Sequence, residues 1–397
     1  MDMHAAGAGR LRTELIEKVE ALAPKIDAAA TRIESERRIV PDVLQAMHQA
    51  RLFRMLLPRS VDGEEVDPET FYRVIERVAM ADSSTAWCLC QGNGCAMSGA
   101  YLAPEVAREI FGPADSVLAW GPGPKVKAVV DGPDGYRVTG SWSFASGGRH
   151  ATWLGADCPL FAADGSPIRD SNGQQLMRVF LVPAGAVRWT DIWNVIGLRG
   201  TASDQFALED HYVRTDHSIT RDYTRERREN GPLYRMSAMF LYAIGFSGVA
   251  LGTARTMLDT FMTFARDKYP RGVKSPIRDN NVVQLGVGQS EAKLRSARAL
   301  LLQSVREVWA DVQRTGTFTI PQRMQLRMAT THAIQQAREV SHFVYHAAGA
   351  TAIFAGNAYE RRFRDLNTVT QQVQGRLAHL ENVGFYLMGG EPDLTFA

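Results

Sequence analysis

The spacing of apolar residues divides the chain into three parts of different character. Between residues 10 and 112, apolar positions recur every three or four residues, which is the period of an amphipathic helix. One such stripe consists of Leu11, Leu15, Val19, Leu22 and Ile26. Another helix is expected to begin at Asp67-Pro68-Glu69, because an acceptor side chain, a proline and an acid favour the first positions of a helix.

Residues 116–217 follow a pattern of short strands and turns. The segment 136–144 alternates in places and follows the turn sequence of residues 131–135. Trp142 and Phe144 share one parity on this strand, so they are expected to point to one face. About eight strands in roughly 100 residues are typical of a small β-barrel or sandwich.

The helical pattern returns after residue 235. Three long antiparallel helices are expected over residues 236–268, 281–315 and 321–349, and a fourth over residues 357–386, which together would form a four-helix bundle. The stretch 236–254 carries no charge, but its three glycines favour a helix buried in protein over one buried in lipid.

These patterns predict a mainly α protein with a central β-domain. The expected domains are an N-terminal helical domain (1–115), a small β-barrel or sandwich domain (116–230) and a C-terminal four-helix bundle (231–397). The net charge of +2 argues against a nucleic-acid-coating protein. The N-terminus lacks an apolar signal segment, so a cytoplasmic location is expected, with neither nucleic acid nor membrane as a partner.

The cysteines and the common cofactor motifs indicate neither a metal site nor a dinucleotide fingerprint. Cys88, Cys90 and Cys95 share one segment without a histidine, a spacing that fits no common zinc pattern, so reduced thiols are expected. The glycine-rich segment 286–291 lacks the third glycine of a dinucleotide fingerprint and lies in a helical pattern. An enzyme of this kind would use an organic cofactor that needs no glycine-rich cradle.

Three segments carry a resemblance to a known family. They are Ser84-Thr-Ala-Trp87, Gly135-Tyr-Arg-Val-Thr-Gly-Ser-Trp-Ser-Phe-Ala-Ser-Gly147 and Arg361-Arg-Phe-Arg-Asp365. With its helix–β–helix order, the chain resembles the acyl-CoA dehydrogenase superfamily. Within it, the chain is similar to the flavin-dependent monooxygenases that serve as oxygenase components of two-component aromatic hydroxylases. The resemblance spans nearly the whole chain and implies an acyl-CoA dehydrogenase-like fold and a homotetramer.

The resemblance implies roles for residues of the β-part. It places Ser146 near N5 and C4a of the flavin, where this serine would help to hold a C4a-hydroperoxide. Phe144 would wall the ring and Gly147 would lie beside it, since an isoalloxazine needs an apolar surface and a few hydrogen bonds. Taken alone, these residues also fit ordinary core aromatics followed by a turn.

Three further residues are candidates for contact with the cofactor. Trp87 corresponds to a tryptophan at the active-site edge, and Trp120 to the strand that passes the flavin; Trp87 also fits a helix-packing role. Arg266 is the candidate for the flavin phosphate, because guanidinium groups favour bidentate recognition, and a solvated helix end is its alternative. Asp365 could pair with a neighbouring arginine and brace the loop.

One region departs from both branches of the superfamily. Acyl-CoA dehydrogenases carry a catalytic glutamate soon after the Arg-Asp pair, but here no carboxylate lies between Asp365 and Glu381, which disfavours thioester dehydrogenation. The aromatic hydroxylases usually carry a histidine in this region, where this chain has Gln372. Because glutamine cannot titrate near neutrality, an electron-rich ring such as an indole is expected rather than a phenol.

The leading hypothesis is a monooxygenase that hydroxylates an aromatic or heteroaromatic small molecule. Reduced FMN or FAD would come from a separate NAD(P)H:flavin reductase, molecular oxygen would add at C4a, and Ser146 and Gln372 would act at the reacting centre. No metal is expected. Two alternatives remain: an acyl-CoA dehydrogenase-like enzyme that oxidises a thioester, and a helical scaffold without activity.

Overall fold

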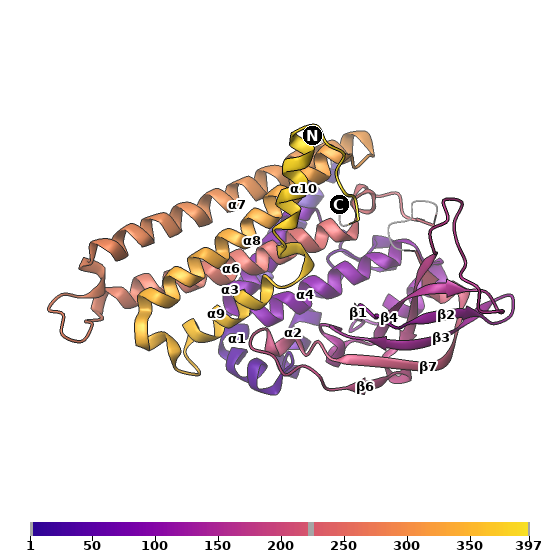
Figure 1. The fold of residues 1–397 in the computed structure, drawn as a ribbon, viewed down its shortest axis with the longest axis horizontal. Coiled ribbons are helices and arrows are strands. Elements are labelled where there is room, and N and C mark those ends of the chain that lie inside the picture. Colours follow the sequence, from indigo (N-terminus) through magenta and orange to yellow (C-terminus); the bar gives the residue numbers. More distant parts are fainter. Residues whose placement is uncertain (1–2, 221–225, 396–397) are drawn as a thin grey trace.

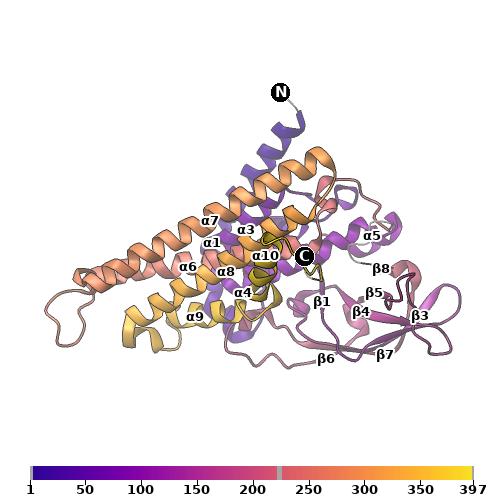
Figure 2. The same cartoon turned by 45° about the horizontal axis from the view of Figure 1, so that its top comes forward.

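The computed structural model describes residues 3–220 and 226–395. Two groups of helices pack side by side, and the strands lie at one end of them (Figure 1). The first group consists of α1 (Met3–Glu36), α2 (Pro41–Gln49), α3 (Pro68–Ala81), α4 (Ser83–Ala96) and α5 (Pro104–Phe111). Figure 2 shows the N-terminal end of α1 projecting beyond the neighbouring helices.

Two aspartates cap the N-termini of α3 and α4. Asp67 accepts a hydrogen bond from the backbone N–H of Thr70 (2.9 Å) and Pro68 is the first helical residue, as the sequence predicts. Asp82 ends α3 and caps α4, accepting from the backbone N–H of Thr85 (2.7 Å). This corner directs α4 into the centre of the molecule, where nearly all of its side chains are buried.

The β-domain is an eight-stranded sheet with its own apolar core. Its strands are β1 (Leu118–Gly121), β2 (Lys127–Val130), β3 (Gly135–Trp142), β4 (Trp153–Phe161), β5 (Met177–Pro183), β6 (Arg188–Thr190), β7 (Gln205–Arg214) and β8 (Ser218–Ile219). The order is β6-β7-β3-β2-β4-β5-β8, with β1 pairing with β4. The pairs β1–β4 and β2–β4 are parallel, and the other pairs are antiparallel.

The prediction that Trp142 and Phe144 share a face is wrong. Strand β3 ends at Trp142, which is fully buried and stacks on Phe206 with ring centroids 5.1 Å apart. Phe144 has φ +60° and its side chain is 59% exposed. The alternation of side chains holds only within a strand, so the left-handed residue after β3 turns the phenylalanine out of the β-core.

The second helical group forms around α6 (Ala238–Asp267), α7 (Asn281–Thr315) and α8 (Ile320–Ala348). These three helices agree with the predicted ones to within a few residues. The predicted fourth helix is wrong as a single element, because it consists of α9 (Ala358–Val369) and α10 (Ala378–Leu387). The chain between them forms a short 3-10 turn, Val373–Gly375, in which the Gln372 side chain accepts from the backbone N–H of Gln374 (2.9 Å).

Helix α6 is the core element that joins the two helical groups. It is the one described helix that is long and apolar enough to cross a membrane, and 89% of its most apolar window is buried inside the protein. Its glycines allow close packing on α3: a Cβ at Gly252 would lie 2.3 Å from the carbonyl oxygen of Glu76. The helix is therefore a protein-buried one, as its composition predicts.

Candidate active site

A cavity of about 540 Å³ lies where α4, the β-domain, α6 and the segment after α9 meet. This volume is within the range of small-molecule sites. Five of the residues singled out from the sequence lie in its wall: Trp87, Trp120, Phe144, Ser146 and Gln372. Residues more than 280 positions apart in the chain therefore contribute to one site.

Aromatic rings form much of the cavity wall. Trp87 stacks on Phe246 with ring centroids 4.0 Å apart, and Tyr242 stacks on the same Phe246 at 5.9 Å. On the side of the β-domain, Phe144 meets Trp193 edge to face at 5.9 Å. Such walls suit a planar aromatic ligand, and Phe144 is exposed rather than packed into the core.

Ser146 lies in a tight turn directly after β3. Its backbone N–H donates to the carbonyl of Phe144 (2.8 Å), and the N–H of Gly147 donates to the carbonyl of Thr201 (2.9 Å). Gly147 has φ +80°, a conformation that favours glycine. Among the described residues, Ser146 lines the cavity and Gly147 does not, so Gly147 shapes the turn that directs the serine.

Gln372 brings an amide group to the opposite side of the cavity. Its oxygen accepts from the backbone N–H of Gln374, which leaves the amide nitrogen for another partner. This nitrogen is buried and has no hydrogen-bond partner within residues 3–220 and 226–395. An unpaired buried donor costs about 1–3 kcal/mol, so the site is built to receive an acceptor atom of a ligand.

The arginine that lines the cavity is not the one singled out from the sequence. Arg266 lies at the end of α6, roughly 30 Å along the helix axis from Phe246, and is not among the residues of the cavity wall. Its role in phosphate binding stays a prediction. Arg376, which the sequence reasoning did not single out, lines the cavity from the loop after Gly375.

Asp365 braces the wall of the cavity through the backbone. Its carboxylate accepts from the N–H of Leu198 (2.6 Å), at the start of a turn in which Leu198 has φ +52° and Ala202 has φ +40°. Burial, with the nearby charge of Asp82, raises the pKa of Asp365 to about 7. The carboxylate thus holds a strained turn that carries Thr201 and Ser203.

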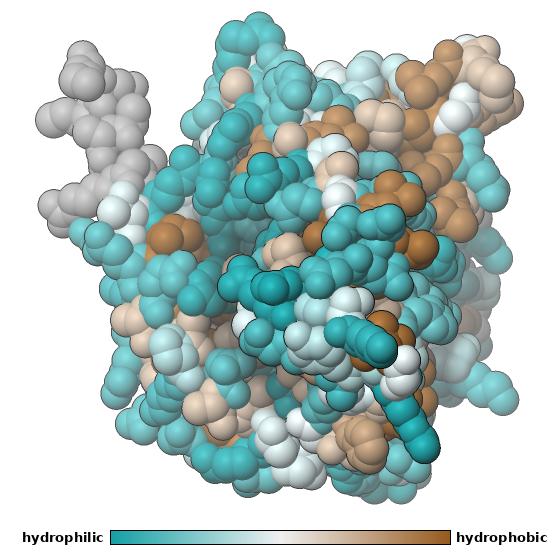
Figure 3. Space-filling model, turned by 90° about the vertical axis from the view of Figure 1, so that its left-hand side faces the viewer, coloured by the Kyte–Doolittle hydropathy of each residue, from teal (hydrophilic) through white to brown (hydrophobic). Residues whose placement is uncertain are grey.

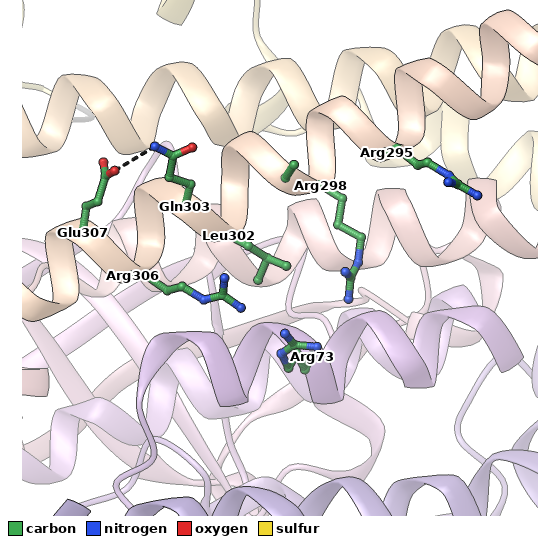
Figure 4. A pocket seen from close by; sticks show the side chains of 8 residues that line it. Arg73, Arg295, Arg298, Leu302, Gln303, Arg306 and Glu307 are labelled. Carbon is green, nitrogen blue, oxygen red and sulfur yellow. Dashed lines mark hydrogen bonds between the residues drawn. The ribbon is translucent and has the colours of Figure 1, made fainter.

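A second hollow lies between α3 and α7. It has a volume of about 720 Å³ and contains no aromatic residue among its described lining. Figure 4 shows Arg73 of α3 facing Arg298 and Arg306 of α7. These arginines bind carboxylates of the protein itself, since Arg73 and Arg306 bond to Glu69 and Arg298 bonds to Glu76. This hollow therefore offers no wall for a flavin ring.

Several residues of the cavity could not be recognised in the sequence. Met239, Tyr242 and Phe246 line it from α6 at spacings of three and four residues, which places them on one face of a helix. That spacing was visible, but it equally fits ordinary core packing. Trp193 and the pair Thr201 and Ser203 come from loops that no motif marked.

The comparisons with known proteins confirm the predicted fold. Residues 244–374 match the family model "Acyl-CoA dehydrogenase, C-terminal domain". The structure of XiaF from Streptomyces sp., in complex with FADH2 and glycerol, is similar with a TM-score of 0.89 at 23% identity, and the match covers 99% of each chain. The molecule therefore has the acyl-CoA dehydrogenase-like fold expected from its helix–β–helix order.

Two curated relatives confirm the predicted class of enzyme. The indole-3-acetate monooxygenase of Acinetobacter baumannii is 29% identical over 370 residues, covering 92% of this chain and 91% of the relative. The oxygenase subunit HsaA of a flavin-dependent monooxygenase from Rhodococcus jostii is 25% identical over 363 residues, covering 88% and 91%. Over most of its length the chain is therefore similar to flavin-dependent monooxygenases, the class of enzyme that the sequence predicts.

Proposed function

We propose that the chain is the oxygenase component of a two-component system that hydroxylates an aromatic or heteroaromatic small molecule. Reduced FMN or FAD, when bound, would supply two electrons and the C4a-hydroperoxide chemistry by which one atom of O2 would enter the substrate ring and the other would leave as water. The residues of the cavity orient the ring, exclude water and hold the hydrogen-bonding edge of the cofactor.

One observation carries this proposal: the cavity combines aromatic walls with two polar groups of different kinds. Ser146 presents a hydroxyl oxygen, and Gln372 presents a buried N–H without a partner among the described residues. A flavin is planar and carries hydrogen-bonding atoms at its N5 edge, so Ser146 would fit that edge, and the N–H of Gln372 on the opposite side would meet an acceptor of the flavin or of the substrate. Ser146 would face N5 and C4a, and Trp87, Trp120 and Phe144 would enclose the rings.

An indole-like ring is the leading candidate for the substrate. Gln372 cannot remove a proton at neutral pH, so it supports a ring that attacks the hydroperoxide without prior deprotonation. The name of the A. baumannii relative, an indole-3-acetate monooxygenase, supports the same choice. Arg376, which lines the cavity, would form an ion pair with an anionic substituent of such a ring.

The proposal includes a separate NAD(P)H:flavin reductase, a cytoplasmic location and a homotetramer. The sequence contains no dinucleotide fingerprint, and the R. jostii relative is named as an oxygenase subunit. Apolar side chains are exposed at one end of the bundle, namely Val282, Leu285, Ile353 and Phe354. Figure 3 views this end and shows hydrophobic residues among the polar ones, which supports contacts between subunits.

Rapid mixing tests the proposed function. The protein would be mixed anaerobically with FMNH2 or FADH2 and then with oxygenated buffer, in the presence and absence of indole-3-acetate. A lasting hydroperoxide absorbance that decays faster with the substrate, together with a hydroxylated product, is the expected result. Oxidation at the rate of free flavin under all conditions would contradict it. Reduction of a dye by an acyl-CoA thioester would then favour the dehydrogenase alternative.

A further inference from the structure

Four side chains form a continuous hydrogen-bonded relay in the wall of the cavity. The indole N–H of Trp87 donates to the Ser146 hydroxyl (3.0 Å), and this hydroxyl lies 2.7 Å from that of Ser203. The Ser203 hydroxyl lies 2.8 Å from that of Thr201, which in turn lies 2.9 Å from the carbonyl oxygen of Leu198. All four side chains are buried.

The hydrogen bond from Thr201 to the carbonyl of Leu198 sets the direction of the other hydroxyl bonds in the relay. A carbonyl has no proton to give, so the single proton of Thr201 points to Leu198. Ser203 must then donate to Thr201, and Ser146 must donate to Ser203, because two hydroxyl oxygens this close need a proton between them. The indole N–H of Trp87 can only donate. The relay therefore leaves the Ser146 oxygen with accepting capacity alone.

The acceptor at the far end is held by the fold. The carbonyl of Leu198 also accepts from the indole N–H of Trp193 (3.0 Å), and its backbone N–H is bound by Asp365 (2.6 Å). The carbonyl oxygen therefore cannot turn away without breaking contacts to two other elements. With the Thr201 hydroxyl donating to this fixed carbonyl, the remaining hydroxyls donate in sequence, from Ser146 to Ser203 and from Ser203 to Thr201.

We propose that Thr201 and Ser203 are positioning residues that make Ser146 a hydrogen-bond acceptor, so that the site selects reduced over oxidised flavin. The inference rests on the proposed function, which places the flavin edge at Ser146. Reduced flavin carries a proton on N5 and donates to an acceptor oxygen. Oxidised flavin has a bare N5, which faces a lone pair of Ser146 instead of a proton. The relay converts this difference into a difference in affinity.

Reversal of the relay is the test. In Thr201→Val the side chain keeps its shape but loses the oxygen that receives the proton of Ser203. That proton then turns to Ser146, and the proton of Ser146 turns to the cavity. The ratio of the dissociation constants of oxidised and reduced flavin is expected to fall about tenfold, since one state loses a hydrogen bond that the other gains. The midpoint potential of the bound flavin falls by about 30 mV with it.

Two further variants make the result specific. Ser203→Ala removes the acceptor of the Ser146 proton directly and is expected to lower the ratio in the same way. Thr201→Ser keeps the hydroxyl and is expected to retain the wild-type ratio and potential. The affinities come from anaerobic titrations with FMNH2 or FADH2 and aerobic titrations with FMN or FAD, with thermal unfolding as the check on folding.

Equal weakening of both redox states in Thr201→Val and Ser203→Ala would overturn the relay, because a merely structural role moves both affinities together. An unchanged ratio would overturn it as well. If the wild-type protein bound flavin in neither redox state, the proposed function itself would fail. The two failures are therefore distinguishable in one set of titrations.

Discussion

Ser146 is the single side chain whose removal should affect the lifetime of the oxygenated flavin most. Its hydroxyl lines the cavity and is held by Trp87 and Ser203. In Ser146→Ala the hydroperoxide is expected to decay about tenfold faster in stopped-flow absorbance, because one buried hydrogen bond to the cofactor is lost. Ser143→Ala is the matched control, since Ser143 bonds to Gln205 (3.2 Å) and is not part of the described cavity wall. Equal lifetimes for the two variants would remove the role of Ser146.

Gln372 is the residue through which the choice between indoles and phenols can be tested. A histidine at this position can accept a proton near neutral pH, so Gln372→His is expected to raise the rate of phenol hydroxylation about tenfold or more. Product analysis with matched phenol and indole substrates measures the change. Gln371→His, one residue away, is the control. No gain on phenols in Gln372→His would mean that this residue is not what excludes them.

At the residue scale, the sequence located part of the polar groups and part of the walls of the site. Ser146 and Gln372 could be proposed because the resemblance marks their segments, and both line the cavity. Tyr242 and Phe246 could not be, because an aromatic stripe on an apolar helix has the same spacing whether it faces a core or a ligand. The face of α6 that lines the cavity is determined by how α4, the β-domain and the segment after α9 pack around this helix. No local sequence pattern encodes that packing.

At the scale of elements, periodicity predicted the long helices and failed where tertiary contacts end an element. The segment 357–386 is apolar at helical spacing, yet the structure divides it into α9 and α10. Side chains of α8 hold the break: Gln335 donates to the carbonyl of Gly375 (2.6 Å), and Arg327 bonds to Gln374. These partners lie some 40 residues away in the chain, so the turn that carries Gln372 follows from packing rather than local propensity.

The bond from α9 to the Leu198 turn should make stability depend on pH. Burial raises the pKa of Asp365 to about 7, whereas an aspartate of the unfolded chain has a pKa of about 4. Between these two pH values the carboxyl group is protonated in the folded protein and ionised in the unfolded chain. The ionised carboxylate therefore costs stability as the pH rises from about 4 to 7. In Asp365→Asn the side chain can still accept from the N–H of Leu198 but does not ionise. The free energy of unfolding of this variant, relative to that of wild type, is therefore expected to rise by about 1–3 kcal/mol from pH 4 to pH 8.

Urea denaturation across this pH range measures the effect. Asp267→Asn, an exposed substitution at the end of α6, is the control and should stay within about 0.5 kcal/mol of wild type at every pH. A constant difference between Asp365→Asn and wild type from pH 4 to pH 8 would show that the carboxylate of Asp365 does not titrate in this window.

At the scale of the whole molecule, the cavity exists only because the two helical groups stay in register with the β-domain. Helix α4 belongs to the first group and α6 to the second, and each supplies one of the stacked rings, Trp87 and Phe246. The contact between the groups is partly electrostatic. Glu69 of α3 is bound by Arg12 of α1 (2.8 Å) and Arg306 of α7 (2.7 Å), and also by Arg73 on its own helix.

This cluster should contribute measurably to the stability of the whole chain. Burial alone would raise the pKa of Glu69, but hydrogen bonds from Arg306, Arg12 and Arg73 outweigh it and lower the pKa to about 2. The stabilisation is therefore complete above the unfolded pKa of about 4.3 and is lost as the pH falls toward 2. Glu69→Gln is expected to lower the free energy of unfolding by about 2 kcal/mol at pH 7 and to approach wild type near pH 2.

Chemical denaturation between pH 2 and pH 7 distinguishes this cluster from an ordinary surface pair. Asp131→Asn removes the exposed pair of Asp131 with Arg137 (2.7 Å) and should change stability by less than about 0.5 kcal/mol throughout. Since Glu69 joins three helices of two groups, its loss should also broaden the transition or separate it into two. If Glu69→Gln matched Asp131→Asn at pH 7, the Glu69 cluster would not contribute to holding the two helical groups together.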